Sequence, residues 1–522
     1  MSMRSELVTI ADIVRGQAKA QPDKKAFVFE GTTISYGELD KAASQCAHGL
    51  RALGIEHGER IAYLGKNTPH YFELLMGAAK LGAVVCPINW RIAPPEAAYI
   101  LNDAKARVLF VGAEFVAALD PIRLNAPCIE HVICLEQNAA GLPDYLHWRC
   151  GHATDDPKLA VASDEDAVQL YTSGTTGYPK GAVISHAALL ESNFRGQERD
   201  NPEWNRWCAE DVSLIAMPCF HIGGTAWGLT TLSFGATGVV MREFDPLKVL
   251  DFIDEHRISK LFLVPAAMQI VVNQPRVAEV DFSPLKYILY GASPIPLALL
   301  QRSIEVFQCG FVQMYGMTET SGTIVALPPE DHDPAGNPRM RSAGQALPGV
   351  EIMILDDAGH ARPQGEVGEI ATRSRMNMTK YWNQPDATAA TIDAEGWLRT
   401  GDAGYLDEDG YLFIRDRVKD MIISGGENVY PAEVENAVFD HPAVADVAVI
   451  GVPDDTWGEA VKACVVLKAD AVASEADLIK YARGKIAAYK CPKSVDFVDT
   501  LPRNPSGKVL RRELRSQYSK AS

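Results

Sequence analysis

The sequence predicts a mixed α/β protein with a large N-terminal domain of α/β subdomains plus a β-barrel-like subdomain, and a small α+β C-terminal domain. Up to about residue 340, short apolar strands alternate with amphipathic helices, which favours a mainly parallel sheet covered by helices on both faces. Beyond that point strands shorten and turns become dense. Because 522 residues are too many for one core, we expect one domain over 1–416 and another over 417–522.

The first elements follow from local patterns. Residues 26–29 are apolar and predict a strand. Ser35 and Glu38 have capping-box spacing, so a helix begins after Ser35. Its apolar residues fall on one stripe, namely Leu39, Ala43, Cys46, Leu50 and Leu53. After a strand at 61–64, Thr68-Pro69 predicts a helix with an N-cap threonine and proline at the first position.

The same alternation continues after residue 240. Asp245-Pro246 begins a helix that we expect to end near His256. Further strands are predicted at 261–264, 287–290 and 311–314, with a helix at 296–307. The dense turns after residue 340, such as Asp407-Glu408-Asp409-Gly410, indicate an antiparallel β subdomain. The C-terminal unit is predicted to contain helices at 431–440 and 474–488, strands at 444–450 and 461–467, and a polar, mobile end of about seven residues.

Composition excludes several classes of protein. The formal net charge is −17, and no basic cluster precedes Lys508, so nucleic acid is not an expected partner. The ten cysteines include no CxxC pair and fit buried free thiols in a reducing cytoplasm. No secretory signal is visible, and no run approaches the ~18 apolar residues of a membrane span. Peripheral membrane contact and a homodimer stay open.

Residues 172–181 are the most informative segment. Glycines give backbone freedom there, hydroxyl groups give donors, and one lysine gives a cation, which is a composition suited to polyphosphate. The residues concerned are Thr172, Ser173, Gly174, Thr175, Thr176, Gly177 and Lys180. The segment is not a Walker A loop, because Tyr178-Pro179 displaces the lysine. From composition alone, a plain surface loop would be equally acceptable.

Further motifs follow in a fixed order. They are Pro218-Cys219-Phe220-His221-Ile222-Gly223-Gly224, Gly291-Ala292-Ser293, Tyr315-Gly316-Met317-Thr318-Glu319, Thr400-Gly401-Asp402, Arg417-Val418-Lys419-Asp420, Ser424-Gly425-Gly426-Glu427-Asn428 and Pro505-Ser506-Gly507-Lys508. Together with the loop at 172–181 they closely resemble the adenylate-forming (ANL) superfamily of acyl-CoA synthetases, luciferases and peptide-synthetase adenylation domains. The chain looks most like bacterial fatty-acyl-CoA ligases.

The resemblance implies a two-step reaction with ATP, Mg²⁺ and coenzyme A. A carboxylate resists thiol attack because it is charged and oxide is a poor leaving group. Transfer of AMP makes an acyl-adenylate, which coenzyme A then attacks to release AMP. Charge builds on the α-phosphate and pyrophosphate in the first step, where fixed donors and a metal are effective.

The resemblance also assigns roles in the nucleotide site. The segment from Thr172 to Lys180 would hold the β- and γ-phosphates, Thr318 the α-phosphate, and Glu319 the Mg²⁺. Tyr315 would stack on adenine, in a site that includes Gly291, Ala292, Ser293, Gln313 and Gly316. Asp402, helped by Arg417, would accept the ribose hydroxyls. Taken singly, each of these residues could equally be a turn, cap or core residue.

In the C-terminal part, Lys508 would be the catalytic cation that bridges the substrate carboxylate and the α-phosphate. Lys419 lies at the family's hinge position, about which the small domain rotates after adenylation. Gly425 and Gly426 would then line the channel for the pantetheine arm of coenzyme A, where a side chain would block the thiol.

For the acid substrate, the resemblance gives His221 a gating or positioning role and assigns Ile222, Gly223, Trp227 and Gly322 to the acyl pocket. No aspartate is present to pair with an α-ammonium, so an amino acid is not expected. A medium- or long-chain fatty acid or similar apolar monocarboxylate is favoured, although Trp227 could cap a shorter pocket. The alternatives are an aromatic (cinnamate- or benzoate-type) acid:CoA ligase, a stand-alone acyl-AMP ligase that loads a carrier protein, a luciferase-like oxygenase and an inactive homologue.

Overall fold

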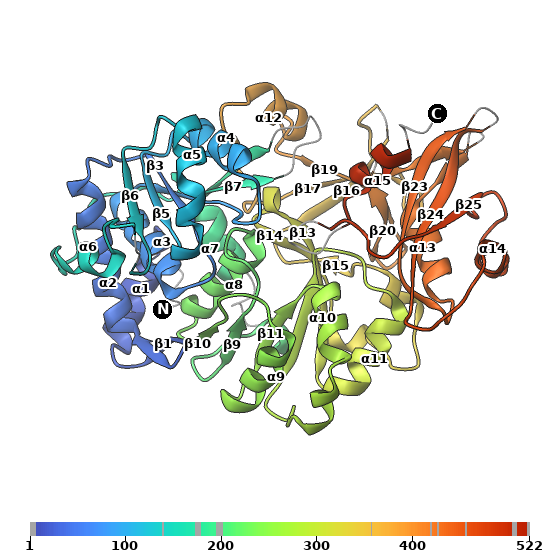
Figure 1. Cartoon of the computed structure of the whole chain (residues 1–522), viewed down its shortest axis with the longest axis horizontal. Coiled ribbons are helices and arrows are strands. Elements are labelled where there is room, and N and C mark those ends of the chain that lie inside the picture. Colours follow the sequence, from blue (N-terminus) through green and yellow to red (C-terminus); the bar gives the residue numbers. More distant parts are fainter. Residues whose placement is uncertain are drawn as a thin grey trace.

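The computed structural model describes residues 7–137, 140–172, 179–194, 202–356, 358–417, 420–424, 427–454, 457–503 and 509–518. The strands of this part of the chain form four sheets, two large and mainly parallel, and two smaller and mainly antiparallel (Figure 1). The mixed α/β class predicted from the alternation of strands and helices is confirmed.

The largest sheet has nine strands in the order β15-β14-β13-β12-β11-β9-β10-β1-β2. Its strands are β1 (Lys25–Phe29), β2 (Thr32–Ser35), β9 (Val212–Ile215), β10 (Thr237–Val240), β11 (Lys260–Leu263), β12 (Tyr287–Gly291), β13 (Gly310–Met317), β14 (Gly322–Leu327) and β15 (Gln345–Ala346). The run from β1 through β13 is parallel, and β2, β14 and β15 pair antiparallel at the two edges.

The second sheet has seven strands in the order β18-β8-β7-β4-β3-β5-β6. They are β3 (Arg60–Leu64), β4 (Val84–Pro87), β5 (Val108–Val111), β6 (His131–Cys134), β7 (Asp166–Thr172), β8 (Lys180–Ser185) and β18 (Lys380–Tyr381). Strands β7 to β6 in this order are parallel, whereas β8 and β18 are antiparallel. Strand β18 comes from a segment that follows β8 by almost two hundred residues in the sequence.

Helices fill the space between these sheets and cover their outer faces. One buried cluster joins α1 (Ala11–Ala20), α2 (Tyr36–Ala52), α3 (Pro69–Leu81), α7 (His186–Phe194) and α8 (Ile222–Ser233) with strands of both sheets. A second cluster packs α9 (Pro246–Glu255), α10 (Pro265–Val272) and α11 (Leu297–Phe307) on the first sheet, and a third packs α4 (Pro94–Ala104) and α5 (Leu119–Asn125) on the second. Helices α6 (Tyr145–Cys150) and α12 (Pro385–Thr391) are short additions.

The remaining two sheets lie in the second half of the chain. The predicted β subdomain is an antiparallel sheet of β16 (Glu351–Leu355), β17 (Gly368–Arg373), β19 (Leu398–Leu406) and β20 (Leu412–Arg417). The C-terminal sheet contains β21 (Ile422–Ser424), β22 (Glu427–Val429), β23 (Val444–Asp454), β24 (Gly458–Leu467) and β25 (Ser494–Phe497). With α13 (Pro431–Phe439), α14 (Glu475–Arg483) and α15 (Arg511–Tyr518) it forms the orange and red unit of Figure 1.

Local signals were accurate at helix starts and less so at helix ends. The capping box at Ser35 forms as predicted. Thr68 is an N-cap residue, but its hydroxyl lies 3.2 Å from the Tyr63 hydroxyl and makes no cap bond. The helix predicted to reach residue 488 ends at Arg483, directly before Gly484. Helix α15 was not predicted, and it is held by the buried Leu514 in a segment that otherwise reads as polar.

All ten cysteines are free thiols, as their scattered spacing predicted. Eight of them are buried or half-buried, whereas Cys150 and Cys208 are exposed. No helix in the described part of the chain combines the length and the apolar character that crossing a bilayer requires.

Helices α2 and α3 approach so closely that only glycine fits at position 77. A Cβ there would lie 2.5 Å from Cys46 Cβ and 2.7 Å from the Ala43 carbonyl oxygen. We expect Gly77→Ala to destabilise the protein by about 1–3 kcal/mol through overpacking, measured as a lower thermal unfolding midpoint. Gly16→Ala in α1 is the control, because a Cβ there meets no atom within 4 Å; it should stabilise slightly. Equal effects of the two changes would contradict this packing.

Candidate active site

The predicted site residues gather where parallel strands end. The carboxyl ends of β9, β12 and β13 lead into the segments of His221, Gly291 and Glu319, respectively. Neighbouring parallel strands end at the same edge of a sheet, which is where α/β proteins bind ligands. Thr172, at the end of β7 in the second sheet, reaches the same place, because its hydroxyl donates to Glu319 Oε1 at 3.2 Å. Two sheets therefore contribute to one site.

Glu319 is the centre of this arrangement. It lies in a single 3₁₀ turn, Thr318–Thr320, and is only 5% exposed. Its Oε1 also accepts a hydrogen bond of 2.8 Å from the Tyr381 hydroxyl. Sequence reasoning did not find Tyr381, because nothing in the segment Lys380-Tyr381-Trp382 indicates that it folds back against residue 319.

The segment predicted to hold phosphates connects two paired strands. Thr172 of β7 is opposite Lys180 of β8 in the antiparallel register, and the strand pair that ends at these two residues is called the hairpin below. Ser173, Gly174, Thr175, Thr176 and Gly177 lie outside the described residues. At the end of the hairpin, the Lys180 ammonium lies 5.0 Å from the centre of the Tyr381 ring, a cation–π distance.

A second pair of predicted residues is in direct contact. The Tyr315 hydroxyl donates to Asp402 Oδ2 at 2.7 Å, and Asp402 is 7% exposed. The Thr400 hydroxyl accepts from the Asp402 amide, while Gly401 has a φ of +71°, which suits glycine. Strand register places the Cα of Arg417 opposite that of Asp402. The residues predicted for adenine and ribose thus lie side by side.

The predicted glycines near adenine are also required by the sheet itself. A Cβ on Gly291 would lie 2.1 Å from the Met314 carbonyl oxygen, and one on Gly316 would lie 1.9 Å from that of Gly322. Ala292 has a φ of +68°, in the left-handed region. Ser293 is partly exposed next to it, and Gln313 Oε1 accepts a bond of 3.2 Å from the Tyr290 hydroxyl.

His221 occupies the N-cap position of α8. Its Nε2 is buried and has no hydrogen-bond partner among the described residues. Burial, with a smaller contribution from the nearby Arg91 cation, lowers the pKa of His221 to about 4. The ring is therefore neutral at physiological pH and has one unpaired nitrogen, which suits the gating or positioning role implied by the resemblance.

The predicted acyl-pocket residues lie along and beside α8. Ile222 is buried, and Gly223 faces the Phe262 ring, since a Cβ there would approach Phe262 Cε1 to 3.1 Å. Trp227 is fixed by a bond from its Nε1 to the Leu214 carbonyl oxygen and packs on Phe262 and Trp207. Gly322 has a φ of +115° and lies beside Ser192. Phe262 was not predicted, because it reads as an ordinary strand residue.

Besides the five residues of the phosphate segment, four more predicted residues lie outside the described part of the chain, namely Lys419, Gly425, Gly426 and Lys508. Their roles stay predictions.

The donor set around Glu319 suits Mg²⁺. This ion prefers hard oxygen ligands and is usually held by one or two carboxylates together with substrate phosphates. Glu319 supplies a buried carboxylate and Thr172 an adjacent hydroxyl. Among the described residues, no group of three or more His, Cys, Asp or Glu could form a metal cage without a substrate. Nucleotide phosphates would have to complete the coordination.

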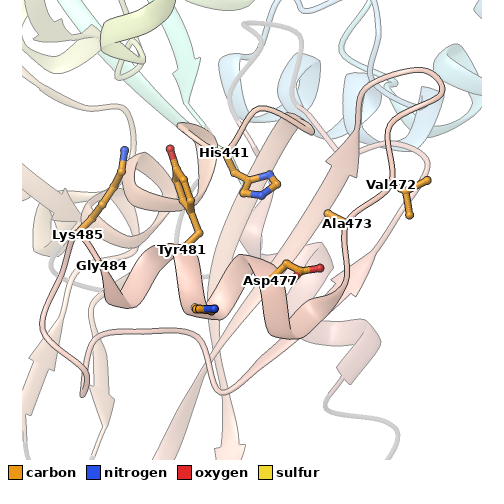
Figure 2. A pocket seen from close by; sticks show the side chains of 8 residues that line it. His441, Val472, Ala473, Asp477, Tyr481, Gly484 and Lys485 are labelled. Carbon is orange, nitrogen blue, oxygen red and sulfur yellow. The ribbon is translucent and has the colours of Figure 1, made fainter.

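A separate pocket lies in the C-terminal domain, with a volume of ≈ 540 Å³ (Figure 2). Its lining comprises His441, Val472, Ala473, Asp477, Lys480, Tyr481, Gly484 and Lys485. Two of its polar groups are engaged within the domain, since the Tyr481 hydroxyl and the Lys485 ammonium both bond Asp440. None of the predicted site residues lines this pocket.

Comparison with known proteins agrees with the sequence motifs. The AMP-binding enzyme family model matches residues 14–382, and that of the AMP-binding enzyme C-terminal domain matches 433–508. A fatty acid–[acyl-carrier-protein] ligase of Streptomyces coeruleorubidus is 41% identical over 98% of this chain and 97% of its own. A long-chain-fatty-acid–CoA ligase of Mycobacterium tuberculosis is 37% identical over 97% and 98%.

Among solved structures, an anthranilate CoA ligase in complex with anthranoyl-AMP is similar to this chain with a TM-score of 0.89. It is 28% identical, and the match covers 99% of both chains.

The buried His221 predicts an acid sensitivity. Because its pKa is lower in the folded state than the ordinary 6.5, the unfolded chain binds more protons between about pH 6.5 and 4. Stability contributed by neutral His221 is lost as the pH falls through this window. We expect His221→Gln to reduce the loss of unfolding free energy between pH 7 and pH 5 by about 2 kcal/mol, measured by denaturant titration.

The control for this measurement is His360→Gln, because the His360 side chain is exposed. His186 and His332, whose pKa values burial also lowers to about 4, keep contributing in both variants. An unchanged acid dependence in His221→Gln would show that the ring is not held neutral.

Proposed function

This chain belongs to the AMP-binding enzyme family and is an AMP-forming acid:CoA ligase, and we propose that its acid substrate is an apolar monocarboxylate of medium or long chain length. ATP and coenzyme A are the other substrates of such ligases. The observation that supports the apolar acid best is the surface of α8 directly after His221.

On that surface, small and partly exposed residues recur with helical spacing. They are Gly223, Ala226 and Thr230, and the half-buried Phe262 ring borders them at Gly223. Both strand neighbours of Phe262 are buried, so Phe262 itself can be half-buried only because space adjoins its ring. Trp227 points away from this stripe toward β9, where its Nε1 bonds Leu214. The three residues of the stripe carry no charge, and the indole does not cap it.

The proposed first step joins the acid carboxylate to the α-phosphate of ATP. Thr318 donates to that phosphate, Lys508 neutralises the two anions as they meet, and neutral His221 positions the acid next to α8. When bound, Mg²⁺ lowers the charge of the phosphates, and Glu319 holds it. Asp402 and Tyr315 orient the ribose and the adenine. The hairpin that ends at Lys180 holds the phosphates that leave as pyrophosphate.

For the second step we propose that residues 417–522 move as a unit about Lys419. Lys508 leaves the site, and Gly425 and Gly426 approach to admit the pantetheine thiol, which attacks the acyl carbonyl and releases AMP. Two buried clusters lie within this unit, one around Val449 and Leu478 and another around Ile450 and Leu514. Because this unit has hydrophobic cores of its own, movement as one body is supported. Ten free thiols support a cytoplasmic location.

Two alternatives have specific support. A relative named as a fatty acid–[acyl-carrier-protein] ligase is 41% identical to this chain, which favours a carrier-bound thiol as the acceptor. A structural neighbour that holds anthranoyl-AMP favours an aromatic acid. The phosphopantetheine thiol is chemically the same in coenzyme A and in a carrier protein, so the adenylating half of the proposal holds for both.

A panel of acids tests the substrate. Pyrophosphate release would be measured with saturated acids from acetate to palmitate and with benzoate and cinnamate, each with free coenzyme A or with an acyl-carrier protein. We expect kcat/KM to rise with chain length up to a medium or long acid. Each buried methylene contributes about 0.8 kcal/mol, or roughly fourfold in kcat/KM. Preference for benzoate over every fatty acid would contradict the proposal.

Ala226→Leu provides the matched test of the α8 stripe. The added side chain should lower kcat/KM for the longest acids at least about tenfold while leaving short acids unaffected. Thr230→Val, which changes polarity without adding volume, is the control. If both variants keep the wild-type length profile, the chain does not run along α8.

Lys508→Ala separates the two half-reactions. Loss of a cation that acts only during adenylation should slow acyl-adenylate formation by about 3–4 kcal/mol, or several hundredfold. Thioester formation from a synthetic acyl-adenylate should be spared, because Lys508 has left the site by then. Quenched-flow measurement of both steps checks this expectation, and equal losses in the two steps would contradict the domain movement.

A further inference from the structure

Tyr381 touches two parts of the proposed nucleotide site at once. Its hydroxyl donates to Glu319 Oε1 at 2.8 Å, and its ring lies 5.0 Å below the Lys180 ammonium. The residue is 8% exposed and belongs to neither the hairpin nor the Glu319 turn. Tyr381 is therefore placed to fix the hairpin relative to the Glu319 turn.

The hydrogen bonds to Glu319 leave its carboxylate asymmetric. Tyr381 and Thr172 both donate to Oε1, at 2.8 and 3.2 Å. Within the described residues, no hydrogen bond or ion pair reaches Oε2. A carboxylate held through one oxygen presents the other in a fixed direction, and a metal ligand that is oriented in this way costs less to order.

The ring of Tyr381 contacts a second group, the Lys180 ammonium. Lys180 ends the hairpin whose first residue, Thr172, also bonds Glu319. The negative face of an aromatic ring attracts a lysine ammonium, and the attraction is stronger when the ammonium is partly desolvated. The ring thus limits where the Lys180 charge can lie before any phosphate arrives.

Tyr381 can position other groups because its own backbone is firmly held. Strand β18 pairs with β8, and the Trp382 amide donates to the Gly181 carbonyl oxygen at 2.7 Å. The Trp382 indole donates to the Asp103 carbonyl oxygen and stacks under Arg60 at 3.5 Å. A further backbone bond of 2.7 Å joins the Met378 amide to the Glu319 carbonyl oxygen.

A salt-bridge network extends this support. Asp166, at the start of β7, accepts from Arg60 at 2.8 Å and lies 3.3 Å from the Lys380 ammonium. Lys380, the residue before Tyr381, is thus tied to the Asp166 carboxylate. Arg60, which stacks on Trp382 directly after Tyr381, is tied to the same carboxylate.

We propose that Tyr381 is a positioning residue for magnesium-bound ATP. Its hydroxyl holds Glu319 Oε1 so that Oε2 is available to the divalent cation, and its ring holds Lys180 beside the phosphates. This inference rests on the proposed function, because it takes Glu319 as the metal ligand and the hairpin as the phosphate site. In this role Tyr381 does not itself contact the substrate and acts through Glu319 and Lys180.

Tyr381→Phe tests the hydroxyl. ATP binding to the full-length protein would be measured by calorimetry without any acid, over a series of Mg²⁺ concentrations. Loss of a hydrogen bond to a buried carboxylate corresponds to about a tenfold change, so the Mg²⁺ concentration for half-maximal ATP binding should rise about tenfold. Affinity for ATP in the absence of Mg²⁺ should change less than twofold, because the ring that holds Lys180 is kept.

Tyr411→Phe is the matched control. The Tyr411 hydroxyl makes an equally short, buried bond of 2.7 Å to a carboxylate, Asp331, in a different part of the fold. It should lower stability to a similar extent, seen in thermal unfolding, and leave the Mg²⁺ dependence at the wild-type value. The same Mg²⁺ dependence in Tyr381→Phe and Tyr411→Phe would overturn the proposal.

A double variant shows whether Tyr381 acts through Glu319. In a Glu319→Gln background, Tyr381→Phe should no longer change the Mg²⁺ dependence of ATP binding. A tenfold effect that persists there overturns the positioning role. Normal ATP binding by the wild type without turnover of any acid would overturn the proposed function and leave this inference standing, whereas no ATP binding at all would overturn both.

Discussion

The two large sheets of this protein meet at one buried carboxylate. Glu319 follows β13, the last strand in the parallel run of the first sheet, while Thr172 and Tyr381, which bond its Oε1, belong to the second. An unpaired buried charge would be costly, so these hydroxyl groups must stay close to it. The same contact fixes the distance between the hairpin at Lys180 and the edge at which the parallel strands end. In the proposed reaction the phosphates and the acid approach from these two sides, so this distance has to stay constant.

The remaining site residues repeat this principle on a smaller scale. The Asp402 carboxylate is oriented by the Tyr315 hydroxyl, while the Asp402 backbone amide donates to Thr400; the Glu319 carboxylate is likewise oriented by Thr172 and Tyr381. In both cases one oxygen of an acidic side chain is held by a tyrosine. Groups arranged before the substrate binds need little reorganisation during the reaction, and this is the main source of electrostatic catalysis. The site is therefore largely assembled by the fold itself.

Those parts of the fold and the site whose signal lies close by in the sequence could be predicted. Features that depend on distant partners could not. Ser35 and Asp245 carry information within a few residues of the helices they begin, and those two predictions are confirmed. The motifs that include Tyr315, Glu319 and Asp402 indicated a shared site because their order resembles a known family. Tyr381 and Phe262 carry no local signal, since their importance arises from partners 62 and 39 positions away, Glu319 and Gly223. Helix α15 was missed because Leu514 is its one buried residue and its other anchors are distant in sequence, such as the ion pair of Arg511 with Glu435.

The salt bridges of Asp166 have a consequence for how genetic variants of this enzyme should be interpreted. Asp166 lies at the opposite end of β7 from Thr172. It forms ion pairs with Arg60 and Lys380, two cations that lie next to the segment holding Tyr381 in place. A substitution there changes none of the proposed site residues, yet it loosens the segment that orients the Glu319 carboxylate. In a mutational screen scored by growth, Asp166 would thus be grouped with the positions proposed to contact the nucleotide, and a map of function drawn from such data would extend well beyond the proposed catalytic centre.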